Sequence, residues 1–124
     1  MSTKKLKLIL AGILLCTATV FADVQINETN FPCENFRTWL LWQSWGTKGY
    51  ITDAEIENIT TILVVGRNIS DLTGIEFFTN LDTLIRSNNQ LTSLDVSRLT
   101  NLKVLNCGWN QLTSLDVSNL INLG

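Results

Sequence analysis

Apolar residues recur at a fixed spacing in the second half of the chain. From Leu81 the order is Leu-x-x-Leu-x-x-x-x-Asn-x-Leu, and the same order begins again 21 residues later at Leu102. The stretch Asn-Gln-Leu-Thr-Ser-Leu-Asp-Val-Ser, nine residues long, is identical in the two copies. A period of this length predicts stacked coils, because one coil cannot bury its own leucines and must cover them with its neighbours.

Each copy is expected to contain a short strand, a turn and a return arm. Parallel strands are predicted around Thr83–Ile85 and Val104–Asn106, with the middle leucine of each pointing inward. The asparagine of each turn is expected to satisfy backbone groups that a coil outside the sheet would leave unpaired. The return arms are expected to bury Leu91, Leu94 and Val96 in one copy, and Leu112, Leu115 and Val117 in the other. The predicted structural positions are Leu81, Leu84, Asn89, Leu91, Leu94, Leu102, Leu105, Cys107, Asn110, Leu112 and Leu115.

A weaker coil precedes these two copies. Residues 59–69 fit the same spacing, 22 residues before Leu81. In this coil either Arg67 takes the asparagine position or a turn one residue longer gives it to Asn68. Its return arm is predicted to bury Leu72, Ile75 and Phe78.

The inward position after each strand holds two very different residues. Cys107 suits it as a small hydrophobic side chain, and we expect it to be neither a ligand nor a disulfide partner. Arg86 does not suit it, because a buried guanidinium without a partner is costly. Two outcomes are open: the side chain reaches out to solvent, or it pairs with Asp82 or Glu76.

Residues 23–58 are predicted to form a helical cap on the first coil. Phe36, Trp39, Leu40 and Gln43 share one helical face, and Pro32 is placed in the first turn of that helix. A second helix is predicted from the capping box that begins at Thr52. The tryptophans are expected to cover the end of the coil core, with a carbohydrate platform as the alternative; they are Trp39, Trp42 and Trp45.

The segment between the two predicted helices resembles a calcium-binding helix–loop–helix. Gly49, Ile51 and Glu55 fall at the sixth, eighth and twelfth loop positions. Ser44, Gly46 and Lys48 stand at the first, third and fifth positions, where oxygen ligands belong. The sequence therefore predicts a loop that has lost its metal, and we expect no metal or other cofactor.

These motifs resemble the leucine-rich-repeat family. The match is closest to bacterial surface proteins with the repeat Leu-x-Cys-x-x-Asn-Gln-Leu-Thr-Ser-Leu-Asp-Val-Ser, and it is looser to the internalins. The resemblance implies a leucine-rich-repeat solenoid, with a short parallel sheet on its concave face, mostly irregular return arms and a small N-terminal helical cap. It also implies adhesion to proteins of a host or of neighbouring cells.

The N-terminus predicts export. Residues 1–22 combine three early lysines with an apolar run and short side chains before Asp23, as a cleaved signal peptide does. A lipid anchor at Cys16 is disfavoured, because Leu15 is not small. No membrane span is expected after cleavage, and an uncleaved anchor is the alternative to a cleaved signal peptide. The three expected segments are residues 1–22, 23–58 and 59–124, the last ending as a further coil begins.

Composition narrows the function further. The chain contains no His, which removes the commonest catalytic base and metal ligand. After Ala22 it carries six basic and eleven acidic residues, so nucleic acid is a poor partner. We expect no catalytic residues and no enzyme activity within this chain.

The leading hypothesis is an extracellular protein-binding module of unidentified partner. Its predicted binding face is formed by Thr61, Leu63, Val65, Thr83, Ile85, Ser87, Val104, Asn106 and Trp109. The alternative is a structural role, as the cap and first coils of a larger surface protein. Self-association through the open C-terminal end, residues 112–123, is also expected.

Overall fold

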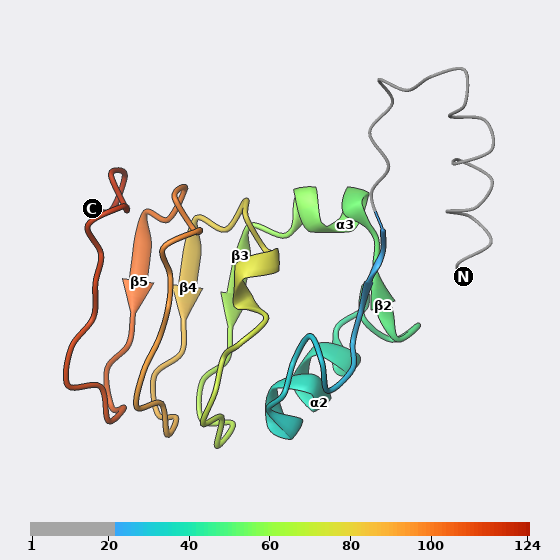
Figure 1. Ribbon diagram of the computed structural model, residues 1–124, viewed down its shortest axis with the longest axis horizontal. Coiled ribbons are helices and arrows are strands. Elements are labelled where there is room, and N and C mark those ends of the chain that lie inside the picture. The colour runs from blue at the N-terminus through green and yellow to red at the C-terminus, as the bar shows by residue number, and fades with distance from the viewer. Residues whose placement is uncertain (1–21) are drawn as a thin grey trace.

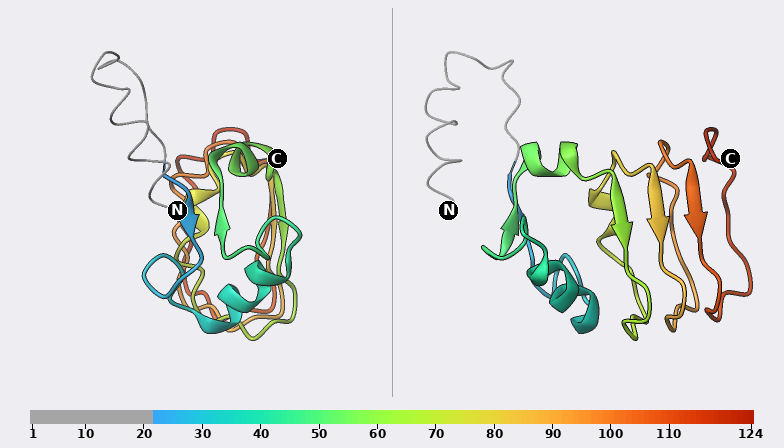
Figure 2. Two further views of the ribbon diagram at one scale, coloured as in Figure 1. Left: turned by 90° about the vertical axis from the view of Figure 1, so that its right-hand side faces the viewer. Right: turned by 180° about the vertical axis from the view of Figure 1, so that it is seen from behind.

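The computed structural model describes residues 22–124. The predicted signal peptide, apart from Ala22, lies outside these described residues. Figure 1 shows a stack of coils with a small cap beside the first one. Seen along the stack in Figure 2, the coils lie one behind another and share one outline.

Three short parallel strands form one side of the stack. They are β3 (Thr61–Leu63), β4 (Thr83–Ile85) and β5 (Val104–Asn106), in that spatial order. Ile62 is paired with Leu84, and Leu84 with Leu105. Both strands predicted from the strong repeat therefore occur at the predicted residues. The register also confirms the offset of 22 residues that aligns the weaker first coil with the second.

The core lies inside the coils and is built from equivalent positions. The return arm of the first coil buries its three predicted residues, which supports the assignment of the weaker coil. Most equivalent positions of the later coils are buried in the same way. The core columns include Ile62 and Leu84; Ile69 and Leu91; Leu81 and Leu102; Phe78, Leu99 and Leu120.

The last coil is less buried than the repeat predicts. Val96 is 1% exposed, whereas its equivalent Val117 is 37% exposed. Leu105, Leu112 and Leu115 are only half-buried. The cause is positional, because no described coil covers this end. Leu94 is also half-buried, so the prediction that the return arm buries this leucine was wrong in an inner coil too.

The cap consists of two helices and a two-stranded antiparallel pair. Helix α2 spans Glu34–Trp42 and α3 spans Asp53–Asn58, while β1 (Val24–Gln25) pairs with β2 (Tyr50–Ile51). Helix α3 begins at the predicted capping box, since the Thr52 side chain and the Glu55 backbone and side chain bond reciprocally. Helix α2 starts later than predicted, because Cys33 is its N-cap. Pro32 therefore precedes the helix.

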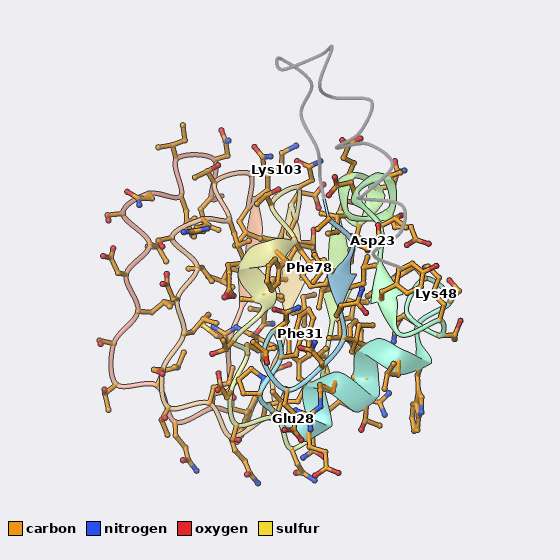
Figure 3. All side chains as sticks on the ribbon, turned by 45° about the vertical axis from the view of Figure 1, so that its right-hand side comes forward. Asp23, Glu28, Phe31, Lys48, Phe78 and Lys103 are labelled. Atoms are coloured by element: carbon orange, nitrogen blue, oxygen red, sulfur yellow. The ribbon has the colours of Figure 1, made fainter. Side chains whose placement is uncertain are left out.

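Aromatic rings join the cap to the coils. Phe31 and Phe78 are fully buried, with ring centroids 6.4 Å apart, and Figure 3 shows them side by side. Gly74, at φ 106°, begins the short 3-10 helix η1 (Ile75–Phe77). A Cβ on Gly74 would lie 2.1 Å from the Phe31 ring. Glycine is therefore required there by both the backbone and the neighbouring ring.

Asn89 is the most heavily bonded side chain inside the turns. Its Oδ1 accepts hydrogen bonds from the backbone N–H groups of Arg67 and Ile69, at 3.0 Å each. Its Nδ2 donates to the carbonyls of Val64, Arg86 and Ser87. Asn89 thus joins two consecutive coils, as the sequence predicts.

Asn110 repeats this arrangement one coil later. Its Oδ1 accepts from Leu91 N–H at 3.1 Å, and its Nδ2 donates to the carbonyls of Arg86, Cys107 and Gly108. The predicted role of both turn asparagines is therefore confirmed by their hydrogen bonds.

The turn of the first coil is not bonded by an asparagine side chain of its own, as the turns of the next two coils are. The register places Arg67 at the asparagine position, but its guanidinium lies 6.0 Å from the centre of the exposed Trp42 ring. Asn68 instead adopts a left-handed backbone with φ 54°. Its carbonyl accepts a hydrogen bond from Asn35 of α2 at 2.9 Å. The side-chain amide of Asn35, from the cap, thus bonds the first turn. Neither Arg67 nor Asn68 supplies a side-chain amide there as Asn89 and Asn110 do in their turns.

Replacing Asn89 by Ala should lower the free energy of unfolding by about 3 kcal/mol, because several buried backbone groups would lose their partners. Asn101→Ala is the matched control, since that exposed amide makes one bond of 3.5 Å to Thr79. It should cost less than about 1 kcal/mol. Urea denaturation measures both, and equal losses would contradict the role assigned to Asn89.

Candidate functional site

The outward positions of the strands and of the turns that follow them form one continuous surface. We call it the sheet face and define it by the nine residues predicted for binding. Each coil contributes three of these residues. The strand register places equivalent residues of neighbouring coils side by side, with Thr61 beside Thr83 and Thr83 beside Val104. The sheet face comprises Thr61, Leu63, Val65, Thr83, Ile85, Ser87, Val104, Asn106 and Trp109.

The sheet face carries no formal charge, combines five apolar with four polar side chains, and is partly exposed to solvent. Leu63 is 52% exposed, Val65 43% and Val104 48%. Ile85 is half-buried between its neighbours, as are Thr83 and Ser87. Large aliphatic side chains in a row, rather than scattered singly, are typical of surfaces that bind other proteins.

Trp109 lies at the end of the sheet face in an unusual backbone conformation. Its ring is 84% exposed, and its φ is 56°. The repeat aligns it with Asn88, at φ 58°, and with Gly66, at φ 65°. Asparagine and glycine tolerate this left-handed region, whereas a bulky residue there is a genuine outlier. The fold thus carries a strained tryptophan where a smaller residue would fit better.

A hollow of about 420 Å³ continues the sheet face toward the cap. Thr61 belongs to both, and Trp45 contributes an aromatic wall from the cap side. The exposed surface therefore continues beyond β3, lined there by both polar and apolar side chains. The lining residues are Trp45, Ala54, Glu55, Asn58, Ile59, Thr60 and Thr61.

The three cap tryptophans do not behave alike. Trp39 is 8% exposed and Trp45 is half-buried, and their rings lie 6.3 Å apart. Trp45 in turn lies 6.0 Å from Phe78 of the first coil. These two residues cover the end of the core as predicted. Trp42 is 69% exposed, so its predicted place in that cover was wrong, because it lies on the solvent side of α2.

The calcium-like loop is occupied by a cation of the protein itself. Lys48 Nζ donates to both carboxylate oxygens of Glu55 at 2.7 Å and to the Trp45 carbonyl at 2.8 Å. The hydrogen bond from Lys48, helped by Thr52 N–H, holds the pKa of Glu55 below its usual value. The ammonium thus takes the oxygen atoms that a metal ion would need. Within residues 22–124 no group of three His, Cys, Asp or Glu side chains could hold a metal.

Arg86 follows neither of its two predicted outcomes. Its side chain is 0% exposed, and none of its three guanidinium nitrogens has a hydrogen-bond partner. Strand alternation forces it inward, since Ile85 and Ser87 face outward. The two candidate acids bond elsewhere: Glu76 accepts from Gly74 N–H at 2.7 Å, and Asp82 accepts from the Thr83 hydroxyl at 2.8 Å.

Both thiols of the described chain are free. Cys107 is half-buried in the last coil, at the position that the repeat aligns with Arg86. Cys33 lies in the cap, at the start of α2. Burial raises the pKa of the Cys33 thiol, but backbone N–H groups, including that of Phe36, outweigh burial and lower it below the usual value.

One structural ladder was not predicted from the sequence. Asn80, Asn101 and Asn122 each donate to a carbonyl of the preceding turn, those of Glu57, Thr79 and Thr100. The signal was present, because these asparagines recur at spacings of 21 residues. A second ladder is formed where an aspartate accepts from the residue two places on: Asp71 from Thr73, Asp95 from Ser97 and Asp116 from Ser118. Each of these hydrogen bonds shapes the turn that follows the aspartate.

The fold and site define a leucine-rich-repeat solenoid of the internalin-like kind. The functional domain of InlJ from Listeria monocytogenes, which includes a cysteine ladder, superposes with a TM-score of 0.72 at 31% identity, covering 85% of this chain and 23% of its own. The internalin InlF of the same species superposes with a TM-score of 0.69 at 30% identity. The match covers 86% of this chain and 32% of InlF. Internalin C2 of the same species shares the fold, with a TM-score of 0.72 at 21% identity. The match covers 86% of this chain and 48% of internalin C2.

The chain spans less than half the length of each of these structures. No protein-family model matches the sequence, and no curated protein matches it either. Over residues 22–124, no helix has the length and apolar character needed to cross a membrane.

Replacing Arg86 by Met should raise the free energy of unfolding by about 2 kcal/mol, because an unpaired buried charge is exchanged for an apolar side chain of similar length. Arg37→Met is the matched control with the opposite sign. Arg37 donates to the Phe31 and Pro32 carbonyls at 2.8 and 2.9 Å, so its loss should cost about 1 kcal/mol. Thermal denaturation measures both, and a fall in stability for Arg86→Met would contradict the burial argument.

Proposed function

We propose that this chain is an exported, non-catalytic module that binds a protein partner through the sheet face, in an adhesion-type role at the cell surface. The observation that carries the proposal is Trp109, an exposed ring held in a strained backbone. Backbone strain of this kind costs about 1–3 kcal/mol and persists where the residue serves a function. An exposed tryptophan contributes nothing to the core that would offset this cost.

The chemistry of the sheet face supports a protein rather than a charged ligand. The nine residues carry no formal charge, and the largest exposed side chains are Leu63, Val104 and Trp109. Tryptophan is enriched among the residues that dominate binding energy at protein interfaces. A solenoid also offers an extended surface that widens with each coil. We therefore expect a partner with a complementary apolar patch, surrounded by few charges.

The similarity to internalins is consistent with this role. Two of the similar structures, an internalin and the functional domain of InlJ, are at least 30% identical to this chain. The N-terminal pattern of residues 1–22 supports export, which a surface-binding module needs. These are the grounds for proposing secretion or surface display.

Trp109→Asn separates binding from folding. Asparagine occupies the equivalent position of the preceding coil, so the variant should be as stable as the parent or more stable by about 1 kcal/mol. Capture of cell-surface proteins on the immobilised chain should nevertheless fall at least about tenfold, as for an interface residue worth more than 1.4 kcal/mol. Ile85→Ser should also weaken capture.

Trp42→Gln is the control for this experiment. It removes an equally large aromatic ring that is 69% exposed on α2 and lies outside the sheet face. Capture should be unchanged, because the binding surface is intact. Equal loss of capture in Trp42→Gln, or full capture by Trp109→Asn, would count against the sheet face.

The second candidate is a structural role at the start of a larger array, with a further coil or a second copy covering the last one. The half-buried leucines of the last coil and the 37% exposure of Val117 favour it. Strand β5 also pairs on one side only, which leaves an edge that can accept another strand.

Sedimentation at increasing protein concentration tests this second candidate. If a second copy covers the end, the chain should dimerise, and Val117→Lys should abolish the dimer by placing a charge in the contact. Thr92→Lys, on an exposed position of an inner coil, should leave the dimer intact. A monomer at all concentrations would exclude self-association through this end.

A further inference from the structure

The hollow between the cap and the first coil lies beside the sheet face but is built from different elements. Helix α3, Trp45 from the segment between the cap helices, and residues 59–61 at the start of β3 line it. Figure 1 shows α3 next to that end of β3. The volume of about 420 Å³ lies within the range of about 300–1,000 Å³ that is typical of sites for small ligands. Such sites occur preferentially where two structural units meet.

Trp45 forms the aromatic wall of the hollow and is held from behind by two other rings. The centre of its ring lies 6.3 Å from that of Trp39, at an interplanar angle of 67°, and 6.0 Å from that of Phe78, at 58°. Both of these neighbours belong to the buried core, whereas Trp45 is only half-buried. The indole is therefore pre-organised, and a ligand that contacts it does not have to order it first.

Polar groups from α3 and from the start of β3 line the same hollow. Asn58 Nδ2 donates to the Ala54 carbonyl at 2.9 Å, which orients the side-chain amide and leaves its Oδ1 as an acceptor. Thr60 and Thr61 are exposed, and each hydroxyl can both donate and accept. This combination of an aromatic wall with amide and hydroxyl groups suits a ligand that has one apolar face and several hydroxyls at its edge.

The hollow carries no unpaired charge. Glu55 is the one ionisable residue among those that line it, and Lys48 Nζ donates to both of its carboxylate oxygens at 2.7 Å. Glu55 Oε2 also accepts from the Thr52 N–H at 2.9 Å. Because the carboxylate is already paired, the hollow offers no free charge to a cation or an anion. Charge complementarity therefore favours a neutral ligand.

We propose that this hollow binds one uncharged hexopyranose unit of a glycan. The apolar C–H face of the sugar ring packs on the Trp45 indole, while its hydroxyls bond to Asn58, Thr60 and Thr61. An apolar side chain of a protein would leave these polar groups without partners, so the sugar suits the hollow better. The site goes beyond the proposed binding of a protein by the sheet face. A partner that carries glycans can contact both surfaces at once, which raises its overall affinity.

The first test is saturation-transfer NMR of the chain with free glucose, galactose, mannose and N-acetylglucosamine. At least one of them should receive saturation from the protein. Its dissociation constant should be about 2 mM, the affinity expected of a ligand with about 12 non-hydrogen atoms. Absence of transfer to all of these sugars, at about ten times that concentration, would overturn the proposal.

Ala54→Phe places the site in the hollow. It adds a ring from an exposed position of α3 that lines the hollow, so it should abolish the transfer. Glu57→Phe is the matched control, because it adds the same ring at an exposed position of α3 outside the lining residues, and it should bind sugar as the parent does. Asn58→Ala should weaken binding about fivefold, through the loss of one acceptor. Circular dichroism checks that each variant is folded, and equal binding by the two Phe variants would contradict the proposed site.

N-acetyl-phenylalanine amide separates a sugar from a protein side chain. If this probe bound, was blocked by Ala54→Phe, and the sugars did not bind, the hollow would be a pocket for an apolar side chain and the sugar proposal would be wrong. The capture experiment with Trp109→Asn is independent of these measurements, because Trp109 lies in the last coil and does not line the hollow. Failure of either proposal is therefore distinguishable from failure of the other.

Discussion

The constraint on which this fold depends is the satisfaction of backbone groups where there is no sheet. Each coil has a strand of only three residues, so most of its N–H and C=O groups have no strand partner. Backbone hydrogen bonds between consecutive coils pair some of these groups. Asparagine amides pair others, because one amide can accept and donate at the same time. Asn89 and Asn110 do so inside the turns, and Asn80, Asn101 and Asn122 do so where the return arms end. The leucines can then be buried without isolating the backbone groups beside them.

The sequence predicted the parts of the structure that repeat. The strands β4 and β5, the turn asparagines and the inward leucines follow from side chains at fixed offsets, and each depends only on its own coil and the next. The capping box of α3 is equally local. What could not be predicted depends on neighbours that the repeat does not specify. The exposure of Val117 reflects the absence of a covering coil among the described residues, and that of Trp42 reflects which side of α2 is buried, since Phe36, Trp39 and Leu40 lie on that side.

Arg86 shows the limit of pattern reasoning most clearly. The repeat fixes its inward direction, and electrostatics indicates that it needs a partner, but the partner must come from through-space neighbours. Glu76 and Asp82 are close in sequence and bond elsewhere. The fold tolerates the defect because a solenoid distributes stability over contacts between neighbouring coils. The contacts with the coils on either side therefore offset the free-energy cost of the unpaired guanidinium in one coil.

The left-handed position shared by Gly66, Asn88 and Trp109 has a consequence for how such a protein diversifies. The position stands outside the core, so a change there alters neither the leucine columns nor the asparagine ladders. It recurs once in every coil, at the rim of the same face. A substitution at this position in one coil therefore leaves the other coils unchanged. Its cost is no more than local backbone strain. The residue at this position can therefore change in one coil independently of the other coils, and the rest of the fold does not have to change with it.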